Sequence, residues 1–172
     1  MIVHMEYDGQ QLDWKGMGKF KATSGLGGAQ LPSEQCKGDM GPIPEGVYKV
    51  FLGDKGAAAD DGTNSCTLIP AKGIQTIPRG AAAGMCEPLW ANWGDNRARL
   101  EPADVATRAK CRPRRGGFYL HDSVKGYTHG CIEVEGRIFS LLRNHHKITK
   151  AQTLTLRVAY VPGRATNGGT KI

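Results

Sequence analysis

Leu154-Thr-Leu-Arg-Val-Ala-Tyr160 decides the fold class, because large apolar residues alternate with polar or small ones along its whole length. In an extended chain successive side chains point to opposite faces, so this alternation puts one face against a core and the other toward solvent. The segment is therefore predicted to be a half-buried β-strand.

The segment before this strand has the period of a helix. Ile138, Leu141, Leu142 and His145 recur at positions i, i+3, i+4 and i+7, which predicts a helix with one apolar face. A second, short helix is predicted at Pro102–Lys110, where a proline stands at the start and an acidic residue lies in the first turn.

The N-terminal part has the turn residues that typically separate short strands. Tyr7-Asp-Gly-Gln10 predicts a hairpin turn between strands at Ile2–Tyr7 and Gln11–Trp14. Gly41-Pro-Ile-Pro-Glu-Gly46 is a rigid turn that leads into a strand at Val47–Leu52. We interpret Gly53–Asn64 as a polar loop. The chain is thus predicted to be mainly β, with one or two short helices around one core.

Length and composition limit the number of domains and the class of protein. A chain of 172 residues with 40% apolar and 23% charged residues is predicted to form one globular domain, here residues 1–162, followed by a polar C-terminal tail at 163–172. No apolar run approaches the roughly 18 residues of a membrane span, and no secretory signal is visible at the N-terminus. The net charge of +7 favours an anionic partner.

The chain has five cysteines, an odd number, so at least one cannot form a disulfide within it. None belongs to a Cys-x-x-Cys pair, which disfavours a cysteine-rich zinc site. Two disulfides with one free thiol, or five free thiols, both fit the count.

The most informative stretch for chemistry is His121-Asp-Ser-Val-Lys-Gly-Tyr-Thr-His129-Gly130-Cys131. A cysteine attacks acyl carbons as its thiolate, and a nearby imidazole is expected to raise the ionised fraction and relay the proton. Gly130 would let a substrate approach the backbone closely and present an N–H to an oxyanion. A structural interpretation stays open, in which the cysteine is a small buried apolar residue. A zinc site from His121, His129 and Cys131 lacks a fourth ligand in the sequence.

Thr128-His-Gly-Cys-Ile132 resembles the Ser/Thr-His-Gly-Cys-hydrophobic signature of the L,D-transpeptidase catalytic domain, the YkuD-like fold. His121, at the end of Phe118-Tyr-Leu-His121, matches the upstream histidine of that family. Gly41-Pro-Ile-Pro-Glu-Gly-Val-Tyr48 and Trp93-Gly-Asp-Asn-Arg-Ala-Arg-Leu100 resemble a compact subgroup that includes type VI secretion effectors. The resemblance runs from about residue 18 to 142 and implies a single domain built as a β-sandwich or barrel.

This sequence departs from the family pattern in two places. The interval from His121 to Cys131 is short, which implies a more open site. Glu133 stands where the family commonly has an arginine, so another basic residue, such as Arg115, would have to hold a substrate carboxylate.

The resemblance also implies roles for individual residues. Cys131 would be the nucleophile, His121 the favoured general base, and His129 a residue that shapes the pocket and contacts substrate. The backbone carbonyl of Asp122 would orient the His121 ring. The remaining binding residues implied are Thr128, together with Gly130 and Cys131, whose N–H groups would form the oxyanion hole.

The activity implied is that of an L,D-carboxypeptidase or L,D-transpeptidase, without a metal or other cofactor. The enzyme would cleave between diaminopimelate and D-alanine in peptidoglycan stem peptides, and exchange D-amino acids. As an effector made without a signal peptide, it would act in the periplasm of target bacteria, with a secretion-apparatus component and an immunity protein as partners. In that oxidising compartment the four cysteines other than Cys131 would be free to form two disulfides.

Three other functions remain in view. A papain-like peptidase would place its cysteine before its histidine, the reverse of the order seen here. A nucleic-acid-binding module would use Arg112–Arg115, yet the chain lacks aromatic residues interleaved with basic ones, so no nucleic-acid partner is expected. A metal hydrolase would lose its activity to a chelator.

Overall fold

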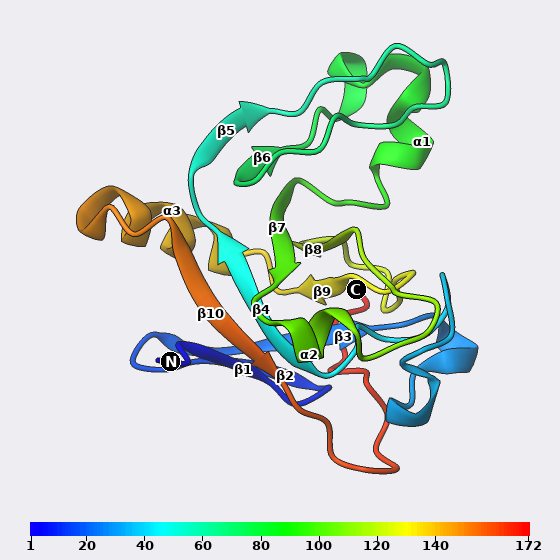
Figure 1. Ribbon diagram of the computed structural model, residues 1–172. Coiled ribbons are helices and arrows are strands. Elements are labelled where there is room, and N and C mark those ends of the chain that lie inside the picture. The colour runs from blue at the N-terminus through cyan, green and yellow to red at the C-terminus, as the bar shows by residue number, and fades with distance from the viewer.

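The computed structural model describes all residues 1–172, and strands dominate it (Figure 1). Eight strands close into a barrel in the order β4-β10-β1-β2-β3-β9-β8-β7, with β7 pairing back to β4. The prediction of a mainly β domain is confirmed, and its sheet closes into a barrel. The barrel strands are β1 (Met5–Tyr7), β2 (Gln11–Trp14), β3 (Gly18–Ser24), β4 (Gly46–Phe51), β7 (Asn96–Pro102), β8 (Phe118–His121), β9 (Ile132–Val134) and β10 (Thr153–Val158).

The alternating segment forms β10 and supports the barrel as its pattern predicts. Leu154, Leu156 and Val158 are buried, and β10 pairs with β4 on one side and β1 on the other. Twenty-four buried residues, most of them from the barrel strands and α3, make one continuous core. The 12-residue helix α3 (Ile138–Thr149) lies beside the barrel and contributes Ile138, Phe139 and Leu142 to that core (Figure 1).

A lobe stands away from the barrel, between β4 and β7 in the chain (Figure 1). It contains β5 (Asp54–Ala57), β6 (Ile74–Thr76), α1 (Glu87–Trp90) and the short 3-10 turns η3 (Gly80–Ala82) and η4 (Gly84–Cys86). β6 extends the barrel sheet from the edge of β7, and β5 adds to β6. A separate core of five residues fills the lobe, namely Ala58, Leu68, Ile77, Ala83 and Trp90.

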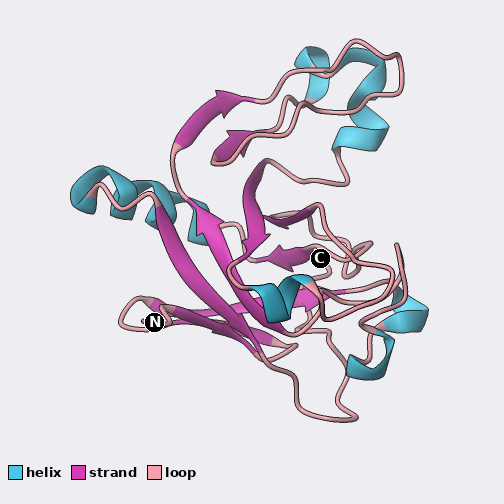
Figure 2. Cartoon of the chain, in the orientation of Figure 1, coloured by secondary structure: helices cyan, strands magenta, loops and turns pink.

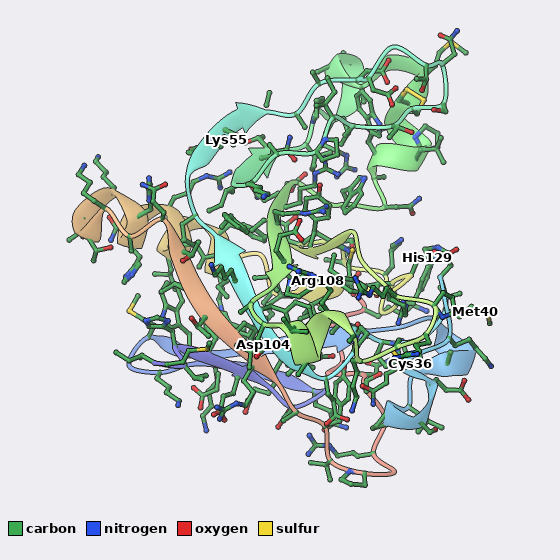
Figure 3. All side chains as sticks on the ribbon, in the orientation of Figure 1. Cys36, Met40, Lys55, Asp104, Arg108 and His129 are labelled. Atoms are coloured by element: carbon green, nitrogen blue, oxygen red, sulfur yellow. A yellow bond between two sulfur atoms is a disulfide. The ribbon has the colours of Figure 1, made fainter.

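Two disulfides join distant segments. Cys66 pairs with Cys86 inside the lobe, where the bond is visible beside α1 in Figure 3, and Cys36 pairs with Cys111 across 75 residues. Cys131 is the one free cysteine. Of the two possibilities left open by the cysteine count, the structure adopts two disulfides and one thiol.

Two local predictions were wrong. The polar loop expected at Gly53–Asn64 contains β5, because its backbone completes the sheet even though its side chains are exposed. The helix expected at Pro102–Lys110 is only α2 (Val105–Arg108), since Pro102 belongs to β7 and the Asp104 side chain caps the helix by accepting from Thr107 N–H.

Long loops surround the barrel, as Figure 2 shows, and two further 3-10 turns, η1 (Gly27–Ala29) and η2 (Pro32–Glu34), lie in one of them. Residues 163–172 contain no helix or strand, but they pack onto the barrel. Thr166 and Thr170 are buried, and the Thr166 hydroxyl donates to the Ser24 carbonyl. None of the helices has the length and apolar character that crossing a membrane requires.

Candidate active site

Two neighbouring strands present the chemically active side chains on the outer face of the barrel. β8 and β9 are parallel, with Leu120 opposite Ile132 and His121 opposite Glu133. Leu120 and Ile132 are buried in the barrel core, so the alternation of a strand turns His121 and Glu133 to the opposite face. Cys131 immediately precedes β9 and shares that outer face with His121. The thiol and the imidazole are therefore brought together by adjacent strands.

A cleft of about 450 Å³ opens over this face. It lies between the end of the barrel and the last residues of the lobe, and glycines make up part of its wall. The residues that line it are Gly38, Asp39, Asn92, Trp93, Arg114, Arg115, Gly116, Gly117, Phe118, His121, Lys125, Thr128, His129 and Cys131. Of the predicted site residues, Cys131, His121, His129, Thr128 and Arg115 line the cleft.

The Cys131 thiol is half-buried in the cleft wall. Its Sγ is 4.0 Å from the carbonyl oxygen of Gly117, and neither histidine hydrogen-bonds to it. Burial raises the pKa of the thiol to about 11, against the opposing effects of the Tyr119 backbone and the guanidinium groups of Arg97, Arg99 and Arg115. The resting thiol is protonated at neutral pH.

His121 is buried on the same face. Its Nδ1 lies 3.0 Å from Ser123 Oγ, and the edge of its ring meets the Trp93 ring with centroids 5.4 Å apart. Burial lowers the pKa of His121 to about 3, and the positive charges of Lys125 and Arg97 add to this effect. The backbone carbonyl of Trp93 favours the charged ring and works in the opposite direction.

The resting site therefore holds a neutral thiol beside a neutral imidazole. This corrects the expectation that the neighbouring imidazole keeps a larger fraction of the thiol ionised, because burial is the largest influence on both groups and disfavours the charged form of each. The arrangement suits general-base catalysis, in which the proton leaves sulfur as sulfur attacks.

His129 occupies a different environment at the rim of the cleft. It is exposed, and its Nδ1 lies 3.0 Å from the carbonyl oxygen of Asp39. Figure 3 shows His129 near Met40, the next residue along that loop. Its position at the mouth suits contact with a bound substrate.

Thr128 builds the turn that carries the cysteine. Its buried Oγ1 accepts hydrogen bonds from the N–H groups of Gly25 (3.0 Å) and Gly130 (3.1 Å), and donates to the carbonyl of Cys131 (2.6 Å). The Gly130 N–H is thus engaged within the turn. The Cys131 N–H forms no hydrogen bond in the protein, so it is the donor that remains for an oxyanion.

Position 130 requires a residue without a side chain. Its φ is +133°, and a Cβ there would lie 2.5 Å from Arg115 Nη2. Arg115 in turn donates to four backbone carbonyls: Nη1 to Gln35 and Pro42, both at 2.7 Å, and Nη2 to Gly41 (3.1 Å) and His129 (3.2 Å). Arg115 braces the cleft, and none of these partners neutralises its charge.

Asp122 lies beside the cleft without lining it. Its carboxylate accepts from the backbone N–H groups of Asp95 and Asn96 and from the Asn96 side chain, at 2.7–2.9 Å. The ring of His121 is oriented by Ser123, and no hydrogen bond to the Asp122 carbonyl is formed. Asp122 holds the turn that precedes β7.

Sequence reasoning missed Arg97, which is buried outside the cleft lining and whose positive charge acts on both His121 and Cys131. Its guanidinium lies 4.3 Å from the centre of the Tyr119 ring and 4.5 Å from that of Trp93. It donates only to the neutral oxygens of Gln75 and Ile69. The signal that could have found it is the alternation Arg97-Ala-Arg-Leu100, which puts both arginines on one face of a strand.

No protein-family model and no curated protein matches this chain. Nor does any group of three or more histidine, cysteine, aspartate and glutamate side chains come close enough together to hold a metal ion.

Proposed function

We propose that the protein is a cysteine acyltransferase of the L,D-transpeptidase (YkuD-like) kind, acting on peptidoglycan stem peptides. The observation that carries the proposal is a free thiol and a buried imidazole on one face of adjacent strands, open to a cleft. The resemblance of Thr128-His-Gly-Cys-Ile132 to the family signature adds to it.

The charges around the cleft favour an anionic substrate. Arg115 lines the cleft and is held by hydrogen bonds to neutral oxygens alone, and Lys125 also lines it, where its Nζ donates to Asn92. A guanidinium group without a carboxylate partner attracts a carboxylate, such as the one that ends a tetrapeptide stem. The buried Arg97 adds its positive charge from behind the lining residues. They also stabilise the negative charge that develops on sulfur and on the carbonyl oxygen.

The reaction proceeds in two steps. Cys131 Sγ attacks the carbonyl carbon at the L-centre of diaminopimelate while His121 takes the thiol proton, and the Cys131 N–H faces the developing oxyanion. The C–N bond to D-alanine breaks, and His121 returns the proton to the leaving amine. Water then hydrolyses the thioester, or the amine of a D-amino acid or of a neighbouring stem takes up the acyl group. The open cleft favours trimming and exchange over crosslinking.

His121 serves as the base and His129 as a contact for substrate in this proposal. His121 is buried on the face that carries Cys131, whereas His129 is exposed and its Nδ1 meets a backbone carbonyl. The His121→Ala variant is expected to lose product formation, and His129→Ala to raise KM with a smaller effect on kcat.

The test of the activity uses defined tetrapeptide muropeptides and mass spectrometry of the products. Wild-type protein should convert tetrapeptide to tripeptide, and should add a labelled D-amino acid when one is supplied. Cys131→Ala should do neither. Unchanged tetrapeptide with folded, reduced wild-type protein would end the proposal.

The biological setting proposed is that of a type VI secretion effector, made in the cytoplasm and delivered to the periplasm of target bacteria. The two disulfides support the proposal that the protein acts in an oxidising compartment. A secretion-apparatus component and an immunity protein would be its partners. Expression with an added export signal should be toxic, and toxicity should require Cys131. Toxicity of the protein retained in the cytoplasm, or of exported Cys131→Ala, would contradict this setting.

A further inference from the structure

Glu133 is a fully buried carboxylate in the site, and four donors surround it. Its Oε2 accepts from the Ser123 hydroxyl and the Lys125 N–H (3.0 Å), and its Oε1 accepts from the Gly126 N–H (2.8 Å) and the Thr170 hydroxyl. The two backbone N–H groups can only donate, and each faces a different oxygen, so the side chain here must accept hydrogen bonds at both of its oxygens. An arginine at this position would face these N–H groups with further donors.

Ser123 connects Glu133 to the imidazole. Its Oγ bonds to Glu133 Oε2 and lies 3.0 Å from His121 Nδ1. A hydroxyl has one proton to donate, and a carboxylate that already receives three other hydrogen bonds accepts that proton. Toward His121 the Ser123 oxygen must therefore act as an acceptor, which requires a proton on Nδ1.

We infer that Glu133, acting through Ser123, fixes the His121 tautomer with hydrogen on Nδ1, so that Nε2 is the nitrogen that takes the Cys131 proton. The inference rests on the proposed function for the use of that nitrogen. Glu133 and Ser123 are positioning residues, because they act on the reaction through His121. In the attack the S–H bond breaks, the S–C bond forms, and the proton passes to Nε2, while Nδ1–H stays bonded to Ser123.

The first test reads the tautomer directly by NMR. Protein labelled with ¹⁵N-histidine is recorded at pH 7, where the low pKa of His121 keeps the ring neutral, and the His121 signals are assigned with a His121→Gln variant. Long-range correlations from the ring protons distinguish Nδ1–H from Nε2–H. The inference requires Nδ1–H in the wild-type protein, and Nε2–H would overturn it.

Variants at Ser123 then test the link. Ser123→Ala should abolish the preference for Nδ1–H, and Ser123→Thr, which keeps the hydroxyl, should retain it. Ser140→Ala is the matched control, because it removes a hydroxyl on α3 that donates to the Arg137 backbone carbonyl, outside the site. An unchanged His121 tautomer in Ser123→Ala would overturn the inference.

Turnover of tetrapeptide muropeptide gives the functional arm. Ser123→Ala should lower kcat by about 100-fold, the lower end of what a positioned acid–base group contributes, while Ser123→Thr restores most of it. An equal kcat in Ser123→Ala and wild type would overturn the inference. A correct tautomer in a protein that leaves the muropeptide unchanged would leave the positioning by Glu133 standing and refute the proposed function alone.

Discussion

Removing the Cys36–Cys111 disulfide should lower both the stability of the fold and the turnover of muropeptide. The bond closes a loop of 75 residues, for which loop entropy in the unfolded chain gives about 4.5 kcal/mol, against about 3.3 kcal/mol for the 20-residue loop of Cys66–Cys86. In a domain of this size these losses correspond to falls in Tm of about 9–18 °C and about 7–13 °C, respectively.

The same bond holds one wall of the cleft. Cys36 follows Gln35, whose carbonyl accepts from Arg115 at 2.7 Å, and Cys111 Sγ lies 3.6 Å from that carbonyl. Without the bond, the segment that contains Gln35 is free to move away from Arg115. The Cys36→Ala/Cys111→Ala double variant should therefore lose more activity than the Cys66→Ala/Cys86→Ala pair.

Denaturant unfolding followed by circular dichroism measures the stability, and muropeptide turnover at a temperature where both variants are folded measures the activity. Cys131 stays in place in both, so the nucleophile is constant. A loss below about 1 kcal/mol for the 36–111 pair would contradict the entropic reasoning. A larger activity loss in the 66–86 pair would contradict the role given to that wall.

Three further predictions follow from the site. Gly130→Ala should lower stability by about 1–3 kcal/mol and reduce turnover, because φ is +133° and the new Cβ meets Arg115; unfolding and turnover equal to wild type would contradict this. The free energy of unfolding should fall as the pH drops from about 6.5 toward 3, because His121 binds a proton in the unfolded chain while its lowered pKa keeps it neutral in the folded protein. In denaturant titrations, His121→Gln should flatten this pH dependence. Arg97→Gln should raise the thiol pKa further and slow alkylation of Cys131 by iodoacetamide at pH 9; alkylation as fast as in wild type would show that Arg97 does not act on the sulfur.

The strands and the long helix could be predicted because they follow from local periodicity. β10 and α3 each place their apolar residues on one face, and the hairpin at residues 7–10 has a tight-turn sequence. Closure of the barrel could not be predicted, because it depends on β7 pairing with β4, segments about 50 residues apart, after a lobe has been inserted between them.

The candidate site was predictable where residues are close in the chain and not where the fold brings them together. The spacing of His121, His129 and Cys131 was enough to propose a thiol and its base. Arg97 and the contact of Ser123 with Glu133 depend on strand register, which the sequence does not specify. The protonation states were mispredicted because burial, a property of the folded chain, dominates both pKa shifts.

The acyl intermediate on sulfur is the most direct test of the central claim. Wild-type protein is mixed with tetrapeptide muropeptide, quenched in acid within the first turnovers, and digested for mass spectrometry. We expect a tripeptide-muropeptide adduct on the peptide that contains Cys131, sensitive to hydroxylamine and absent from Cys131→Ala. Tripeptide product formed at an undiminished rate by Cys131→Ala would contradict it.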